Sequence, residues 1–259
     1  MTSKKTKKQK EIQQKIKKSF LQFINSFKNK NILWVLLYDI CFILITGVMA
    51  RATSKIMTSQ LTKIGLTNAQ ALSPEIISQQ LGAIKTLAIT FLIITIIFYI
   101  ILVFIYAIFR AWIWTKLMNT KPTKAFVKKF YLLNLLWITG WAIIFGLGIT
   151  ALNPQYYTYL IAIITIAYIH LTTIMHHSFT WEQKIKKSLG KAFITGIGKI
   201  DKFIIPYIYI IVIYIVITKV FAILPQKSRY FMMFALILAF MAWYRTYMND
   251  IIKQIEKKR

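Results

Sequence analysis

Apolar and polar residues are segregated into long blocks along this chain, rather than alternating at the spacing of a water-soluble helix or strand. The clearest apolar block, 87–109, runs 23 residues without a charge. As a helix that rises about 1.5 Å per residue, it is long enough to cross the roughly 30 Å hydrocarbon core of a bilayer. The pattern therefore predicts membrane-spanning α-helices.

Six such helices are predicted, and the expected fold class is all-α, a polytopic membrane bundle. Their approximate ranges are 32–50, 86–110, 131–151, 156–175, 203–224 and 230–248. Pro154 and Pro225 mark the short links between the third and fourth and between the fifth and sixth spans, so each pair is predicted to be a tight helical hairpin. The membrane domain then covers 31–248, between basic ends at 1–30 and 249–259.

The first two spans are separated by a longer outer loop, predicted at 51–85 and rich in uncharged polar residues. Within it, Ser73, Pro74 and Glu75 form a helix-start pattern: a capping serine, a proline at the first helical position and an acid near the positive end of the helix dipole. We therefore expect the second spanning helix to begin near Ser73 and to project beyond the bilayer.

The chain also shows an apparent threefold internal repeat. Gap-free alignment of the segments before the odd-numbered spans gives columns that hold Phe23, Phe126 and Phe193, and Asn31, Asn134 and Asp201. The inferred unit is an amphipathic surface helix, a helix leading out and a helix leading back, with repeats at about 15–118, 119–180 and 181–250. Chance similarity among apolar, lysine-rich helices is the alternative explanation.

The first of these amphipathic helices has the clearest pattern. Lys15, Lys17 and Lys18 lie opposite an apolar stripe that includes Phe20 and Phe23, as expected of a helix resting on a membrane surface. The segments 121–130 and 184–200 have a weaker version of the same pattern.

The distribution of basic residues then indicates how the chain is oriented in the membrane and which partners it binds. The formal net charge is +27, and 27 of the 34 lysines and arginines lie on one side of the predicted spans. The positive-inside rule makes that side cytoplasmic, so the chain is expected to be a multi-pass cell-membrane protein with both termini in the cytoplasm. Because the charge lies beside the spans, the expected partners are a bilayer with anionic head groups and a membrane protein, not a specific nucleic acid.

Asp39 is the acid placed clearly within a predicted span, and ionisable groups inside a membrane are functional candidates. Its expected partner is Arg110 or Arg245, near the inner ends of their spans, where His170 occupies the corresponding position. These four residues form a candidate intramembrane polar site. Three interpretations remain open: a fixed ion pair that locks helix packing, a carboxyl kept neutral by the low dielectric, and a proton or ion pathway.

Asn31, Asn134 and Asp201 lie where each surface helix is expected to turn into a span. Their side-chain oxygens suit helix capping, because they can accept bonds from unpaired backbone amides. The competing interpretation is a cytoplasmic vestibule, in which they join Arg110, His170 and Arg245 to receive anionic head groups.

Motifs for other chemistry are not found in the sequence. His170, His176 and His177 lack the HExxH pattern and nearby acids or thiols, and Cys41 is the single cysteine, so no metal site is predicted. Phosphate-binding loops of the GxxxxGK[ST] type, GxSxG elbows and GxGxxG turns are also absent. We therefore predict no catalytic residue and no cofactor.

The stretch from Ala107 to Ile149 carries a recognisable pattern: Arg110 near the end of one span, the loop Asn119-Thr-Lys-Pro-Thr123, and Phe126 leading into the next span. It resembles the membrane domain attached to some bacterial glycerophosphodiester phosphodiesterases and its uncharacterised stand-alone relatives. Those relatives typically have a glycine before the serine or threonine of this loop, whereas here Asn119 and Thr120 occupy that place. The resemblance implies an architecture and no activity.

The function expected from these patterns is that of a non-enzymatic scaffold or lipid-facing partner. The alternative is a small transporter or channel with a polar cavity near the cytoplasmic side. A cavity lined by Asp39 and other polar side chains would favour transport, and a tightly packed apolar interior would favour the scaffold.

Overall fold

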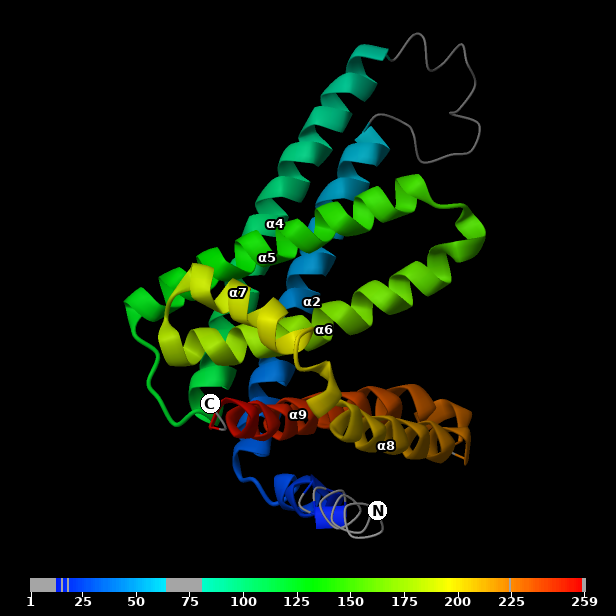
Figure 1. The fold of residues 1–259 in the computed structure, drawn as a ribbon. Helices are drawn as coiled ribbons and strands as arrows, with labels where there is room; N and C mark the ends of the chain where they lie inside the picture. Colours follow the sequence, from blue (N-terminus) through cyan, green and yellow to red (C-terminus); the bar gives the residue numbers. More distant parts are fainter. Residues whose placement is uncertain (1–12, 15, 18, 64–80, 224, 258–259) are drawn as a thin grey trace.

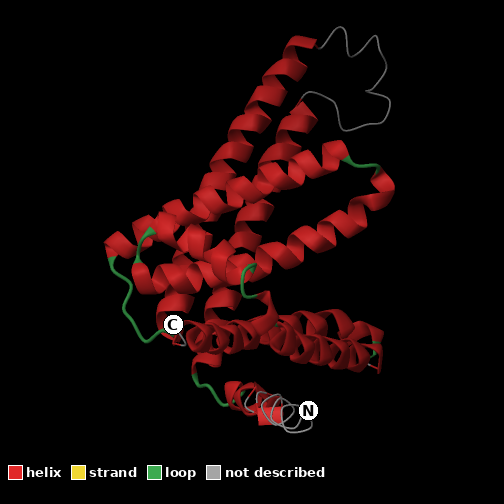
Figure 2. Cartoon of the chain, viewed as in Figure 1, coloured by secondary structure: helices red, strands yellow, loops and turns green. Residues whose placement is uncertain are grey.

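A computed structural model of the chain describes residues 13–14, 16–17, 19–63, 81–223 and 225–257, and in these ranges it contains helices and loops but no strand (Figures 1 and 2). The helices are α2 (Asn31–Lys63), α4 (Leu81–Leu117), α5 (Lys124–Ala151), α6 (Tyr157–Glu182), α7 (Ile185–Gly196), α8 (Ile204–Ile223) and α9 (Gln226–Lys257), with short 3-10 turns at Pro154–Tyr156 and Ile200–Lys202. The predicted all-α fold class is confirmed.

Six helices, all except α7, are long and apolar enough to cross a membrane, which marks the chain as a multi-pass membrane protein. They extend beyond the predicted spans. Helix α2 continues through Arg51 and Lys55 to Lys63, where a loop was predicted, because hydropathy detects the lipid-embedded part of a helix and not its polar extension. The predicted helix start at Ser73 lies outside the described residues.

The six long helices pair into three hairpins, α2 with α4, α5 with α6, and α8 with α9. Figure 1 shows the hairpins fanning out in different directions from a shared end, which we call the base. At the base lie the beginnings of α2 and α5 and the final turns of α4, α6 and α9 (31–39, 103–117, 124–137, 170–182 and 242–257). Contacts of α2 with α9, α4 with α5, and α6 with α9 join the hairpins.

The buried core lies mainly at the base. Its largest fully buried side chains include Trp114, Phe130, Phe179, Phe203 and Tyr247. Toward the hairpin tips, by contrast, large apolar side chains are exposed, among them Ile89, Leu92, Ile163, Ile166, Ile211 and Ile215. Exposed apolar surface of this extent on spanning helices is suited to contact with lipid chains.

The carboxyl end differs from its prediction as a basic tail. Helix α9 continues to Lys257, and Asn249, Ile251, Ile252 and Ile255 are buried along its last turns. The tail interpretation was therefore wrong for 249–257. The three isoleucines recur at helical spacing and pack on one face, a signal that the high lysine content of the segment obscured.

The three predicted surface helices have different structures. Residues 19–26 are helical, and Phe23 packs against α8 and α9, with ring centroids 4.9 Å from Tyr209 and 5.7 Å from Trp243. The prediction of a separate helix at 121–130 was wrong, because Lys124 already begins α5 and Phe126 is buried in the core. Helix α7 is a distinct short helix, but the second segment is part of α5, so the threefold repeat stays a prediction.

Helix α7 packs closely on α6 through Gly196. A methyl group added at Gly196 would lie 2.5 Å from Cδ2 of Leu171 and 3.2 Å from Nε2 of His170, whereas one added at Gly190 meets nothing within 4 Å. We expect Gly196→Ala to destabilise the protein by about 1–3 kcal/mol through overpacking. Gly190→Ala should instead stabilise it by up to about 1 kcal/mol, because alanine favours helix. Thermal unfolding of the two variants tests both predictions. A Gly196→Ala protein as stable as the unsubstituted chain would contradict the close approach of α7 to α6.

Candidate functional site

At the base, Asp39 on α2 contacts both of the arginines that were predicted as alternative partners. Nη1 of Arg110, on α4, donates to Oδ1 of Asp39 at 2.7 Å, and Nη1 of Arg245, on α9, donates to Oδ2. The side chains are 3%, 13% and 10% exposed for Asp39, Arg110 and Arg245. One buried carboxylate thus joins the first and third hairpins, and we call this trio the Asp39 clamp.

Aromatic rings hold the Arg110 side of the clamp. The Arg110 guanidinium lies over the ring of Tyr106, 5.0 Å from its centroid, and 5.7 Å from the centroid of Phe42. Cation–π contacts of this kind are worth more when they are shielded from water. They restrict the guanidinium to one orientation, which favours the fixed ion pair.

Asn134 does not cap a helix, and the capping prediction was wrong for this residue. It lies in the middle of α5, whose true cap is Thr123, with Oγ1 accepting from the amide of Phe126 at 3.1 Å. The Asn134 amide nitrogen donates to the Phe130 carbonyl at 2.7 Å, which leaves its Oδ1 to accept from Nε2 of His176, also at 2.7 Å. This buried pair joins α5 to α6 beside the clamp.

A cavity of about 180 Å³ opens between α4, α6 and α9. Its lining is mixed, with two cations, several hydroxyl groups and apolar surface: Tyr106, Arg110, Trp114, Tyr168, Ile169, Thr172, Thr173, His176, Met241, Tyr244 and Arg245. Both arginines of the clamp therefore face this space. His176 and the tyrosines were not among the predicted site residues, because only the packing of three helices brings them together.

His170 lies away from the clamp and does not line this cavity. Its Nε2 donates to the Gly196 carbonyl at 3.0 Å, and its Nδ1 accepts from the hydroxyl of Tyr207. A singly protonated ring satisfies both bonds. His170 thus connects α6 to the end of α7 and to α8. It does not join Asp39, as the predicted polar site required.

Asn31 and Asp201 do not form the predicted caps either. Asn31 is the first residue of α2, and its own amide donates to Oδ1 of Asn29 at 3.0 Å, so Asn29 performs the capping role. The Asn31 side chain instead donates to the Lys116 carbonyl at the end of α4, at 3.4 Å. Asp201 is exposed in a 3-10 turn ahead of α8. Neither residue lines the cavity.

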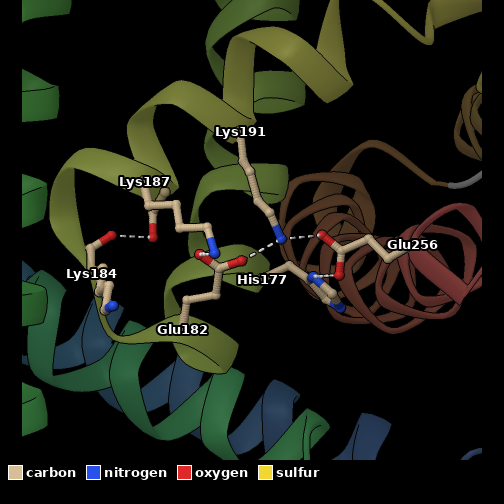
Figure 3. Close-up of polar contacts among 7 residues, drawn as sticks. His177, Glu182, Lys184, Lys187, Lys191 and Glu256 are labelled. Carbon is tan, nitrogen blue, oxygen red and sulfur yellow. Dashed lines mark hydrogen bonds and ion pairs between the residues drawn. The ribbon is translucent and has the colours of Figure 1, made fainter. Parts of the chain in front are cut away.

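A second ion cluster ties α6, α7 and α9 together at the base (Figure 3). Lys191 lies 2.5 Å from Oε1 of Glu182 and 3.3 Å from Oε1 of Glu256, and Lys187 lies 3.1 Å from Oε2 of Glu182. Nδ1 of His177 is 3.8 Å from the second oxygen of Glu256. Sequence reasoning missed this cluster, because nothing in the sequence shows that α7 folds back onto α6.

The charge state of Lys191 reflects this cluster. Burial lowers the pKa of its ammonium group, but the contacts with Glu182 and Glu256 raise it by more, so the net pKa lies above its ordinary value. A raised pKa in the folded protein means that the contribution to stability is present at neutral pH and is lost as the pH rises through that pKa.

No family model, curated protein or solved structure matches this chain. The site must therefore be interpreted from its own chemistry. Among the described residues, no group of three histidine, cysteine or acidic side chains is placed to hold a metal ion. What the base does provide is a buried carboxylate shared by two arginines, beside a cavity that those arginines line.

Proposed function

We propose that this chain is a non-enzymatic membrane protein that acts as a lipid-facing scaffold in the cell membrane, with its base and both termini on the cytoplasmic side. The observation that carries the proposal is the contrast between the two ends of the molecule. Polar and ionic contacts lock the helices together at the base, while the hairpins toward their tips present apolar side chains outward.

The locked base supports a structural role for its polar groups. The Asp39 clamp joins the first and third hairpins, and the contact of Lys191 with Glu182 and Glu256 joins the second to the third. Each acid in these contacts has at least one cationic partner, so none of them is left as an isolated charge in a low-dielectric environment.

The basic residues support the orientation. Of the 34 lysines and arginines, 27 lie in 1–30, 110–130, 176–202 or 245–259, and cytoplasmic segments are enriched in these residues. A basic base next to the inner leaflet favours anionic head groups as partners. The apolar outer surfaces also suit a membrane-protein partner.

A small transporter or channel is the second candidate function, and the cavity of about 180 Å³ beside the clamp is the observation that favours it. Transport needs a path through the membrane and alternate access to the binding site. The described cavity lies at the base alone, whereas a transporter would have to open it toward the hairpin tips.

Two measurements on the purified protein distinguish these functions. Native mass spectrometry is expected to find retained anionic lipid or a partner subunit, and proteoliposomes containing the protein are expected to show no ion or phosphate flux above that of empty vesicles. Flux that is abolished by Asp39→Asn in a protein that remains folded would overturn the scaffold proposal in favour of transport.

A further inference from the structure

We propose that the cavity between α4, α6 and α9 is a binding site for a phosphate group, supplied by a lipid head group or by free phosphate. The inference rests on the proposed function only in placing the base at the cytoplasmic face, where both sources are present.

The Asp39 clamp carries an excess of positive charge. Arg110 and Arg245 share a single carboxylate, that of Asp39, so the trio has one positive charge more than it has negative charges. All three side chains are largely buried, and a buried charge without a counter-charge is costly. A monovalent or divalent anion in the cavity would supply the missing negative charge.

The two arginines also have hydrogen-bond donors beyond those that bind Asp39. The clamp engages Nη1 of Arg110 and Nη1 of Arg245, while a guanidinium has five N–H donors in a planar fork. Because both arginines also line the cavity, their forks meet it from two different helices, α4 and α9. Guanidinium forks match phosphate oxygens especially well, and a tetrahedral phosphate has enough oxygens to bridge two of them.

The rest of the lining completes the site. Tyr168, Tyr244 and Thr172 line the cavity together with the arginines, and hydroxyl groups can donate to phosphate oxygens. Thr173 also lines the cavity, but its hydroxyl donates to the Ile169 carbonyl at 2.7 Å. Ile169 and Met241 add apolar surface, which a phosphate attached to lipid would contact. Among the residues that the structure describes, no aspartate or glutamate lines the cavity, so the cavity does not suit a cation.

The test is thermal unfolding of the detergent-solubilised full chain, titrated with inorganic phosphate, with short-chain phosphatidylglycerol, and with chloride at matched ionic strength. We expect the melting temperature to rise with at least one phosphate compound at concentrations where chloride has no effect. A rise with inorganic phosphate identifies free phosphate as sufficient, and a rise with phosphatidylglycerol alone identifies the lipid as the source. No rise with either compound overturns the proposal.

Variants that fill the cavity test whether phosphate binds there. Met241→Trp and Ile169→Phe each fill the cavity while keeping every charge, and at least one folded variant is expected to lose the phosphate-dependent rise. Arg51→Gln is the matched control, because it removes one positive charge from an exposed position on α2 and should keep the rise. If the folded cavity-filling variants respond like the unsubstituted protein, phosphate binds elsewhere on the basic surface and the proposal fails. The scaffold function is judged separately, by flux and lipid retention.

Discussion

Replacement of Asp39 by asparagine is expected to lower the free energy of unfolding by about 3–5 kcal/mol, the usual cost of removing one partner from a buried ion pair. The asparagine side chain is close to isosteric, so packing is retained while two buried guanidiniums lose their shared carboxylate. Chemical or thermal unfolding of the protein in detergent measures the loss.

Asp201→Asn is the matched control for this prediction. It makes the same substitution at an exposed position in the turn before α8 and should change the stability by no more than about 0.5 kcal/mol. Equal stability of the Asp39→Asn protein and the unsubstituted chain would show that the clamp does not hold the hairpins together. Combined with a loss of transport, that result would support the ion-pathway interpretation.

Trp114→Ala is expected to destabilise the protein by about 3–5 kcal/mol, because it removes the largest fully buried side chain of the base and leaves a cavity. Trp114 is 1% exposed, and its ring lies 6.0 Å from that of His176 and 6.4 Å from that of His177. The substitution therefore removes packing from the meeting point of α4 and α6.

Trp181, which is 71% exposed at the end of α6, provides the control for size and chemistry. Trp181→Ala should change the unfolding free energy in detergent by no more than about 0.5 kcal/mol. Similar losses for the two variants would contradict a core concentrated at the base.

The spanning helices could be predicted because the bilayer imposes one simple requirement, a long run of apolar residues whose backbone bonds are satisfied internally. That Asp39 pairs with an arginine could also be predicted, although Arg110 and Arg245 were expected as alternatives and the structure has both. A buried acid needs a cation, and both arginines were expected near the inner ends of their spans. The helix ends were less predictable, since the extensions of α2 to Lys63 and of α9 to Lys257 leave the apolar pattern.

The rest of the site depends on tertiary contacts that hydropathy does not contain. Asn134 was expected at a helix start, yet it lies inside α5 and bonds to His176 on α6, because Thr123 already caps the helix. His170 shares its sequence pattern with Arg110 and Arg245, but the close approach of Gly196 directs its ring to α7. The contact of Lys191 with Glu182 and Glu256 likewise exists only because α7 folds back on α6.

The most direct test of the whole account is the side of the membrane on which the base and the hairpin tips lie. In a Cys41→Ser background, single cysteines would be placed at Thr120 and Lys186 at the base, and at Asn153 and Gln226 at two tips, all of them exposed positions. A membrane-impermeant thiol reagent applied to intact cells should label the tip cysteines, and the basal cysteines should react only after the membrane is opened. Labelling of basal and tip cysteines from the same side would contradict hairpins that cross the bilayer from a cytoplasmic base.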